Sequence, residues 1–383
     1  MKVTRKGADR IASGHPWVFS SDIADRGNAA AGDAVTVHDQ RGRALGVAHY
    51  SSTSQITLRM LAASAVTVDA AFYRARIEAA EAHRRRVVRD SEAYRLVHAE
   101  GDLLPGLIVD RYGDCFVIQT LDQGMDRASG WIVEALESLF SPRAIVARND
   151  AAVRKLESLP LEKSVLRGEL PAPLEVSMNG LRWRADLLEG QKTGVFLDQR
   201  ENYLAAAGWA RGQALDCFTC SGGFALHMAP RCENVLAVDS SAHSLELAAA
   251  NRDANGIANV EFRESDVFDL LTSFAHARRR FDTIVLDPPA FAKSRQTVEP
   301  ALRGYREINQ RALRLLDRGG VLVTCSCSHH VSEAAFLEML AQSALDAGRT
   351  LRVLERRIQA QDHPVLLTVP ETLYLKCAIV EVL

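Results

Sequence analysis

Long apolar runs are missing from this chain of 383 residues, although 47% of its residues are hydrophobic. No stretch approaches the roughly 18 apolar residues that a membrane-spanning helix needs, so no membrane partner is expected. No apolar core follows the charged start MKVTRKGADR, so no secretory signal is expected. The 7 cysteines are odd in number and unevenly spaced, which argues against a disulfide framework. Together these absences predict a cytoplasmic location.

An excess of charge is also missing, because the formal net charge is only -2. Proteins that bind nucleic acid often carry a basic balance, so this value counts mildly against such a partner. The densest basic cluster is HRRRVVRD, His83 to Asp90. A solvated helix face explains this cluster as well as a surface for nucleic acid does.

Several common motifs for nucleotides and metals do not occur. The lack of a GxxxxGK[ST] loop disfavours a P-loop nucleotidase, and the lack of a three-glycine fingerprint disfavours a nicotinamide dehydrogenase. The stretch VTCSCSHH, Val323 to His330, suggests zinc, which needs four ligands. Cys217 and Cys220 could supply two further ligands, but they lie in the same loop as Gly222. A metal held there would leave this glycine loop unable to bind another ligand, so no metal is expected.

Three regions of different texture follow one another along the chain. Residues 1–70 hold short strand-like runs and predict a small β-rich domain. Residues 71–181 predict a central α+β domain, with helices at about residues 68–88 and 130–139. Residues 182–383 alternate apolar strand-like runs with helical stretches. That order predicts an α/β domain with a doubly wound, mostly parallel sheet, in which ligands bind beyond the carboxyl ends of the strands.

A candidate cofactor site begins in ALDCFTCSGGFALHMA, which has the pattern of a strand, a glycine loop and a helix. Gly222 would let the backbone approach a ligand closely, although a Gly-Gly pair alone is more often a simple turn. Asp239 and Asp266 follow the next two strand-like runs, where acids could hold a ribose and an adenine, or could cap helices. A cofactor with ribose and adenine but no phosphates fits this pattern, which indicates S-adenosylmethionine.

The most specific stretch is FDTIVLDPPAFAKS, Phe281 to Ser294. A buried strand would end at Asp287, because Pro288 and Pro289 cannot donate to the ladder. Phe291 would then be placed to stack on a base. A proline-rich turn with a capping aspartate is the structural alternative.

With LDCFTCSGGF and TCSCS, the DPPAF motif resembles those of class I S-adenosylmethionine-dependent RNA methyltransferases. More closely, nearly the whole chain resembles the large-subunit ribosomal RNA cytosine-5 methyltransferase I family. The matching stretches are RKGADRIASGHPWVFSSDI for a PUA-type RNA-binding domain, AEGDLLPGLIVDRYGD for a central domain, EGQKTGVFLDQREN for the entry to a Rossmann-like catalytic domain and HPVLLTVPETLYLK for a C-terminal hairpin.

This resemblance implies RNA as the partner, namely 23S ribosomal RNA, and leaves a homodimer open. The cofactor-binding candidates are Asp216, Phe218, Gly222, Phe224, Asp239, Ser240, Asp266, Val267, Asp287 and Gln199. The substrate-binding candidates are Pro288, Pro289, Phe291, Lys2, Arg5, Lys6 and Arg10, with the Arg84–Arg86 cluster as an addition to a basic surface that faces the catalytic cleft. Cys220 and the pair His329–His330 depart from the family pattern.

Methylation at carbon-5 of cytosine needs a nucleophile, because that carbon does not attack a methyl donor unaided. A thiolate that adds to carbon-6 activates it, and an acid such as Asp287 would protonate ring nitrogen-3. Cys325 and Cys327 would face the same side of one strand. Cys327 lies nearer the carboxyl end and is the predicted nucleophile, whereas Cys325 is the predicted buried residue. The two histidines are expected to begin the next helix, and His329 is a candidate proton acceptor.

Two further readings stay open. Enzymes that methylate a nitrogen of guanine or adenine share the DPP motif followed by an aromatic residue, but they need no cysteine. A non-catalytic RNA-binding assembly factor would keep the same fold without methyl transfer. Replacement of Cys327 separates the first reading from carbon-5 chemistry, and measurements of cofactor binding and methyl transfer separate the second.

Overall fold

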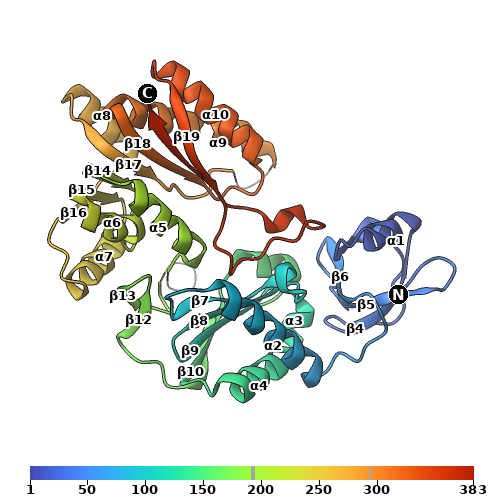
Figure 1. Cartoon of the computed structure of the whole chain (residues 1–383). Coiled ribbons are helices and arrows are strands. Elements are labelled where there is room, and N and C mark those ends of the chain that lie inside the picture. Colours follow the sequence, from blue (N-terminus) through green and yellow to red (C-terminus); the bar gives the residue numbers. More distant parts are fainter. Residues whose placement is uncertain (191–194, 293–294) are drawn as a thin grey trace. The chain divides into compact units, whose positions relative to one another are not determined.

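The computed structural model describes residues 1–190, 195–292 and 295–383, and contacts between its elements divide the chain into two units (Figure 1). The first unit holds residues 1–178, 185–195 and 361–372, and the second holds residues 179–184, 196–360 and 373–383. Two stretches expected with the catalytic region, 185–195 and 361–372, therefore pack with the first unit. Residues 191–194 and 293–294, which fall within the EGQKTGVFLDQREN and DPPAFAKS stretches, lie outside the described residues.

The first unit begins with a six-stranded sheet in the order β2-β6-β5-β4-β1-β3. Its elements are β1 (Lys2–Val3), α1 (Arg5–Ala12), β2 (Trp17–Phe19), β3 (Ile23–Asp25), β4 (Ala34–His38), β5 (Ala44–Tyr50) and β6 (Ile56–Ala62). Val18, Val37 and Leu58 are fully buried and form the centre of a small core. This region is the β-rich domain expected from the sequence.

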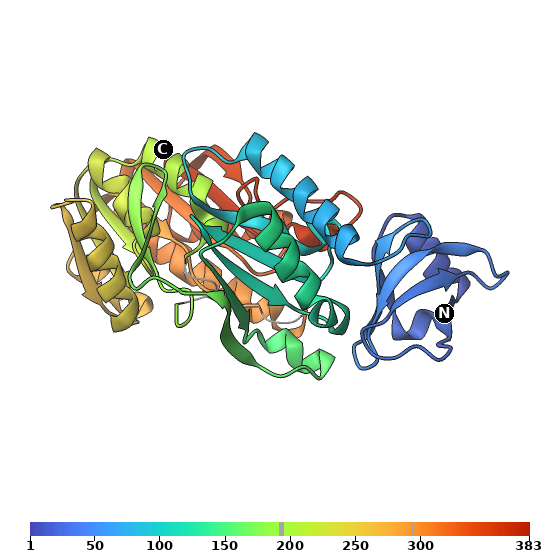
Figure 2. The same cartoon turned by 90° about the horizontal axis from the view of Figure 1, so that it is seen from below.

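A five-stranded sheet in the order β11-β10-β9-β8-β7 completes the first unit. Its elements are α2 (Ala70–Val87), β7 (Ala93–His98), β8 (Leu107–Tyr112), β9 (Cys115–Thr120), α3 (Gln123–Arg127), α4 (Ser129–Phe140), β10 (Ala144–Asn149) and β11 (Glu162–Gly168). The helices α2 and α4 lie side by side against this sheet (Figure 2), and Tyr73, Ile77 and Ile132 from them enter its core. Both helices fall where the sequence predicted them.

Arg84 corrects one expectation, because it does not belong to an exposed basic surface. Its side chain is buried and forms an ion pair with Asp102. Its Nη2 also donates to the backbone oxygen of Asp362 at 2.8 Å, while the Asp362 carboxylate accepts from the backbone of Arg95 at 2.9 Å. The inward face of α2 therefore uses this charge to hold the 361–372 segment in the first unit.

The second unit is built on a seven-stranded sheet in the order β16-β15-β14-β17-β18-β20-β19. Its elements are α5 (Arg200–Trp209), β14 (Gly212–Cys217), α6 (Gly223–Met228), β15 (Cys232–Asp239), α7 (Ala242–Ala254), β16 (Val260–Glu264), α8 (Val267–His276), β17 (Phe281–Leu286), α9 (Val298–Leu315), β18 (Leu316–Ser326), α10 (Glu333–Asp346), β19 (Leu351–Arg357) and β20 (Lys376–Val382). Two short strands, β12 (Leu174–Met178) and β13 (Leu181–Ala185), lie where the chain passes from the first unit to the second. Strands β14 to β18 run parallel, whereas β20 is antiparallel to both of its neighbours.

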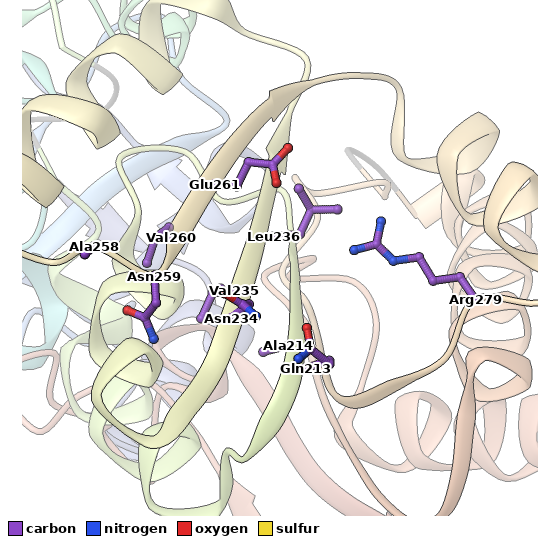
Figure 3. Close-up of a pocket in the computed structure, with 10 residues that line it drawn as sticks. All are labelled: Gln213, Ala214, Asn234, Val235, Leu236, Ala258, Asn259, Val260, Glu261 and Arg279. Carbon is purple, nitrogen blue, oxygen red and sulfur yellow. The ribbon is translucent and has the colours of Figure 1, made fainter.

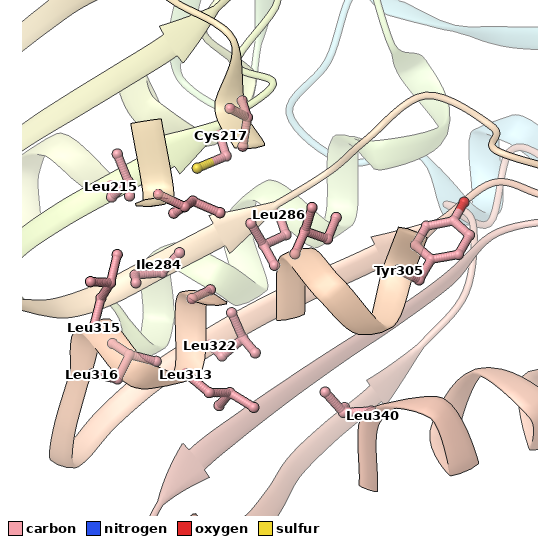
Figure 4. Close-up of a cluster of buried hydrophobic side chains, with 14 of the residues drawn as sticks. Leu215, Cys217, Ile284, Leu286, Tyr305, Leu313, Leu315, Leu316, Leu322 and Leu340 are labelled. Carbon is pink, nitrogen blue, oxygen red and sulfur yellow. The ribbon is translucent and has the colours of Figure 1, made fainter. Parts of the chain in front are cut away.

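One large core holds the second sheet against α8, α9 and α10 (Figure 4). Leu215, Ile284 and Leu322 from three neighbouring strands meet Leu313 of α9 and Leu340 of α10, and all five are buried. Burying a leucine or isoleucine contributes roughly 1.5–3 kcal/mol, so this layer anchors the parallel strands firmly. The strand ends that carry the candidate residues are fixed by this core.

His329 and His330 do not begin the helix that follows β18, which corrects the expectation. Both lie in a turn, and α10 begins at Glu333. Ser332 supplies the cap instead, since its hydroxyl accepts from the backbone of Ala335, a role that histidine performs poorly.

Among the described residues, no helix combines the length and apolar character that crossing a bilayer would demand.

Candidate functional site

The motif residues gather at one edge of the second sheet, where the parallel strands end. Cys217, the last residue of β14, is paired with Val238 of β15 and Leu286 of β17. Leu286 is in turn paired with Thr324 of β18. The turns after these four strands therefore lie next to one another, as the doubly wound topology requires.

The loop between β14 and α6 has an unusual backbone. Phe218, Cys220 and Gly222 all have positive φ, at 66°, 49° and 92°. Residues other than glycine rarely adopt this conformation, and such strain is typical of ligand-binding loops. Asp216 of β14 stabilises the loop, because its carboxylate accepts from the hydroxyl of Thr219 at 2.6 Å and from the backbone of Ala225 at 3.0 Å.

Asp239 joins this loop to the next turn. Its Oδ2 accepts from the backbone of Cys220 and its Oδ1 from the backbone of Ser241, each at 2.9 Å. Ser240 beside it is exposed. A carboxylate has about four lone-pair positions, so two remain available to accept ribose hydroxyls. Asp266 is exposed as well, and its carboxylate caps α8 by accepting from Asp269 at 3.1 Å, the capping role that the sequence left open.

The acidic residues at this edge suit a cationic ligand. Burial raises the pKa of Asp216 to about 7, and the neighbouring charges of Asp287 and Asp239 act in the same direction. The Oδ1 atom of Asp216 is buried without a hydrogen-bond partner. A positive charge nearby would stabilise these carboxylates. S-adenosylmethionine carries a sulfonium and an ammonium group, so the residues fit this cofactor.

Two of the expected cofactor residues are turned into the interior. Phe224 of α6 is 3% exposed and meets the ring of Tyr203 edge-on at 4.8 Å. Val267 of α8 is also 3% exposed and belongs to the core under the sheet. Phe218 is partly buried and packs against the same core. Phe224 and Val267 follow the loops after β14 and β16 in the sequence. The packing of α6 and α8 nevertheless turns their side chains inward.

Asp287 follows β17 directly, as the sequence predicted. Its Oδ1 accepts from Nε2 of Gln199 at 3.0 Å, and Gln199 is almost fully buried. Gln199 belongs to the short helix η4 (Leu197–Gln199), and its contact with Asp287 joins two of the predicted cofactor-site residues. Pro288 is buried and Pro289 is exposed.

The ring of Phe291, the predicted stacking residue, lies against protein side chains. Its centroid is 4.6 Å from that of Tyr305 and 6.4 Å from that of Phe268. The ring is partly buried and packs against the core below the DPP turn, and its stacking on a base stays a prediction. Tyr305 was missed by the sequence analysis, since nothing in its helical setting marks it.

The two cysteines of the TCSCS stretch differ in burial as expected. Cys325 is fully buried inside β18, and burial raises its pKa well above the usual value. Cys327 lies one residue beyond the end of β18 and is partly exposed. Only a partly exposed thiol can meet a substrate, so Cys327 is the accessible one of this pair. His329 stacks on Tyr374, with ring centroids 5.3 Å apart.

A hollow of about 380 Å³ lies at the opposite edge of the same sheet (Figure 3). It is lined by the early residues of β14, β15 and β16, among them Gln213, Asn234 and Glu261, and by Arg279. Ligands of doubly wound sheets bind at the carboxyl ends of the strands, so this hollow lies away from the candidate chemistry.

Comparisons with known proteins agree with this geometry. A PUA-like domain model matches residues 1–63, and a methyltransferase domain model matches residues 210–363. The ribosomal RNA large subunit methyltransferase I of Klebsiella pneumoniae subsp. pneumoniae is 39% identical over 384 residues, which cover 98% of this chain and 96% of that protein. This chain belongs to the same family. The Escherichia coli O139:H28 member is 37% identical, with 98% and 97% covered.

Family membership confirms the assignment to S-adenosylmethionine-dependent methyltransferases and the Rossmann-like fold with a PUA-like domain before it. Two solved structures share the whole fold. One is a methyltransferase complexed with SAH, with a TM-score of 0.87, 19% identity and 100% and 99% of the two chains covered. The other is a SAM-dependent methyltransferase from Streptococcus mutans, with a TM-score of 0.84, 19% identity and both chains fully covered.

Proposed function

We propose that this member of the methyltransferase I family transfers a methyl group from S-adenosylmethionine to carbon-5 of a cytosine in large-subunit ribosomal RNA, 23S RNA, through a covalent cysteine adduct. The observation that carries the proposal is the partly exposed Cys327 beyond β18, beside the turn that holds Asp287. Relatives at 39% and 37% identity are named ribosomal RNA large subunit methyltransferase I, which supports the ribosomal substrate.

Each proposed residue has a task that its position allows. The cofactor supplies an electrophilic methyl group, and the strained loop with Gly222, Asp239 and Asp266 would hold it. The Cys327 thiolate would add to carbon-6 of the cytosine and make carbon-5 nucleophilic. Asp287, oriented by Gln199, would hold and protonate ring nitrogen-3. Loss of the carbon-5 proton and release of the thiolate would complete the exchange.

The substrate side of the proposal uses the PUA-like domain. Lys2, Arg5 and Lys6 are exposed, whereas Arg10 is partly covered by Phe19 and lies 3.7 Å from Asp22. The first three would contact phosphates, with Arg10 as the more restricted partner. A homodimer and a cytoplasmic location stay predictions.

Replacement of Cys327 by alanine tests the chemistry. The protein is incubated with labelled S-adenosylmethionine and unmodified ribosomal RNA, and the modified nucleoside is identified by mass spectrometry. We expect 5-methylcytidine from the native protein and none from Cys327→Ala, because the adduct cannot form. Cys232→Ala, at the far end of β15, serves as the matched control and should keep full activity.

RNA containing 5-fluorocytosine sharpens this test, since fluorine cannot leave in place of the carbon-5 proton. The native protein should then remain attached to the RNA on a denaturing gel, and Cys327→Ala should not. A methylated guanine or adenine that Cys327→Ala still produces would instead support methylation at a base nitrogen. No cofactor binding and no methyl transfer would support an RNA-binding assembly factor.

A further inference from the structure

Lys376 is a buried cation next to the candidate nucleophile. It is the first residue of β20, its exposed fraction is 4%, and it stands opposite Ser326, the last residue of β18. Its Nζ donates to the backbone oxygen of Ser328 at 2.7 Å and to that of Tyr374 at 2.8 Å. The ammonium group therefore contacts the backbone of the residue that directly follows Cys327.

The described surroundings of this ammonium supply carbonyl oxygens but no carboxylate partner. Its two hydrogen bonds use two of its three donors. Burial lowers the pKa of Lys376 to about 8, and the Cys327 thiol acts against this shift by favouring the charged lysine. A buried ammonium without a counter-ion is costly, so an anion beside it would be strongly favoured. The thiolate of Cys327 is the group placed to be that anion.

We propose that Lys376 is a positioning residue that holds Cys327 as a thiolate before the substrate arrives, by acting as its buried counter-ion. In this role Lys376 does not contact the substrate. The role rests on the proposed function only because that function makes the Cys327 thiolate the nucleophile. The third donor of the ammonium would face the sulfur, while the two carbonyl contacts keep it from turning away. Cys325 lies deeper in β18 and is fully buried in the core.

Other titratable groups surround the pair and are held by partners of their own. Tyr305 of α9 shares a hydrogen bond of 3.0 Å with the Ser328 hydroxyl, and Cys327 contributes to raising its pKa. Tyr374 donates to Asp198 at 2.8 Å and stacks on His329. Asp287 after β17 and the buried pair Cys325–Cys377 are further titratable groups of this region that the structure describes. The carboxylates among these described groups oppose a thiolate, whereas the lysine charge favours it.

The rate of alkylation at Cys327 as a function of pH tests this pairing without RNA or cofactor. The native full-length protein is treated with iodoacetamide, quenched and digested, and the Cys327 peptide is quantified by mass spectrometry. We expect its thiol to titrate below the ~8.5 of a free cysteine. In Lys376→Met the apparent pKa should rise by about one unit, which slows alkylation at neutral pH about ten-fold. Lys376→Arg should restore part of the rate, because it keeps the charge.

Two controls give the measurement its meaning. Lys155→Met removes an exposed lysine from the first unit and should leave the profile unchanged. Cys220 is an internal reference, because burial raises its pKa to about 11 and its slow alkylation should not respond to Lys376. An ordinary or raised thiol pKa in the native protein would overturn the proposal, even if Lys376→Met failed to fold. A folded Lys376→Met with an unshifted profile would overturn it too.

The outcome is independent of the proposed function. A lowered thiol pKa that depends on Lys376 would support the ion pair even if the methylated nucleoside proved not to be 5-methylcytidine. In a carbon-5 enzyme, Lys376→Met should also move the acid limb of the pH–rate profile upward, a change that a purely structural lysine would not cause.

Discussion

The carboxylate of Asp287 is held by a chain of buried amide groups. Gln199 donates to it from Nε2, while the Oε1 of Gln199 accepts from Asn202 at 2.7 Å. The Oδ1 of Asn202 accepts from Nε of Arg357 at 2.9 Å. Arg357 can only donate, so it fixes the orientation of the Asn202 amide and thereby that of Gln199. The amide of Gln199 must therefore present its NH₂ group to Asp287.

Replacement of Gln199 by methionine should test this orientation. The variant keeps the side-chain length but leaves Asp287 without its amide donor, so we expect kcat to fall about ten- to a hundred-fold. The fall in kcat should exceed any rise in the KM for S-adenosylmethionine, because the lost bond orients the carboxylate that is proposed to protonate the base. Steady-state methyl transfer measures both constants. Gln213→Met, at the opposite edge of the sheet, is the matched control, and equal activities of the two variants would contradict the role.

Single residues were predictable where chain position alone decides their place. Asp239, Asp287 and Cys327 lie at strand ends, and the periodicity of the strands marked those ends. Phe224 and Phe291 have equally conspicuous positions, yet their rings pack on Tyr203 and Tyr305 from distant helices. No local pattern could indicate those partners.

At the scale of elements, the packing of α5 against α6 fixes the end of the loop between β14 and α6. Gly223 begins α6, and a Cβ at this position would lie 2.4 Å from the Cζ of Tyr203 on α5. Tyr203 is itself 5% exposed and cannot move aside easily. The second glycine of the SGGF stretch is thus required for a close helix contact, whereas Gly222 serves the turn with its φ of 92°.

Gly223→Ala should therefore destabilise the protein by about 1–3 kcal/mol through overpacking, in spite of the better helix propensity of alanine. The affinity for S-adenosylmethionine should fall as well, because the strained loop ends at this residue. Chemical denaturation and calorimetric titration measure the two effects. Gly208→Ala in α5 is the control. Outside its own helix, no atom of the described residues lies within 4 Å of its added Cβ, so this change should stabilise the protein by about 0.5–1 kcal/mol. Similar results for both variants would exclude the close contact as the cause.

Across the whole molecule, the near-neutral net charge is compatible with RNA binding. Some basic residues are buried in ion pairs, whereas others are exposed at the surface. Arg59 of the PUA-like domain and Arg84 of α2 are buried in ion pairs with Glu157 and Asp102. They tie the first unit together and are not available to phosphates. Arg5 has a side chain that is 91% exposed, and Lys6 one that is 72% exposed. The net charge therefore says little about the surface that RNA would meet.

The double substitution Lys2→Ala with Arg5→Ala should weaken RNA binding without affecting cofactor affinity. Each lost phosphate contact should reduce the slope of log K against log salt by about 0.7 for single-stranded RNA. Filter binding over a salt series measures this slope. Lys155→Ala, also in the first unit, is the control, and an unchanged slope in the double variant would remove these residues from the RNA surface.

The sequence by itself determined the order of strands and helices along the chain, the doubly wound α/β class and the positions of the strand-end acids, and it predicted that Cys325 is the buried one of the two cysteines. These follow from periodicity, glycine and proline chemistry and alternation along a strand, all of which are local. Only the tertiary structure decided the rest. Lys376 reaches the backbone oxygen of Ser328, next to Cys327, because β20 pairs antiparallel with β18, and Gln199 reaches Asp287 across 88 residues. Such partners are set by how the sheet closes and how the core packs, so no short stretch of sequence contains them.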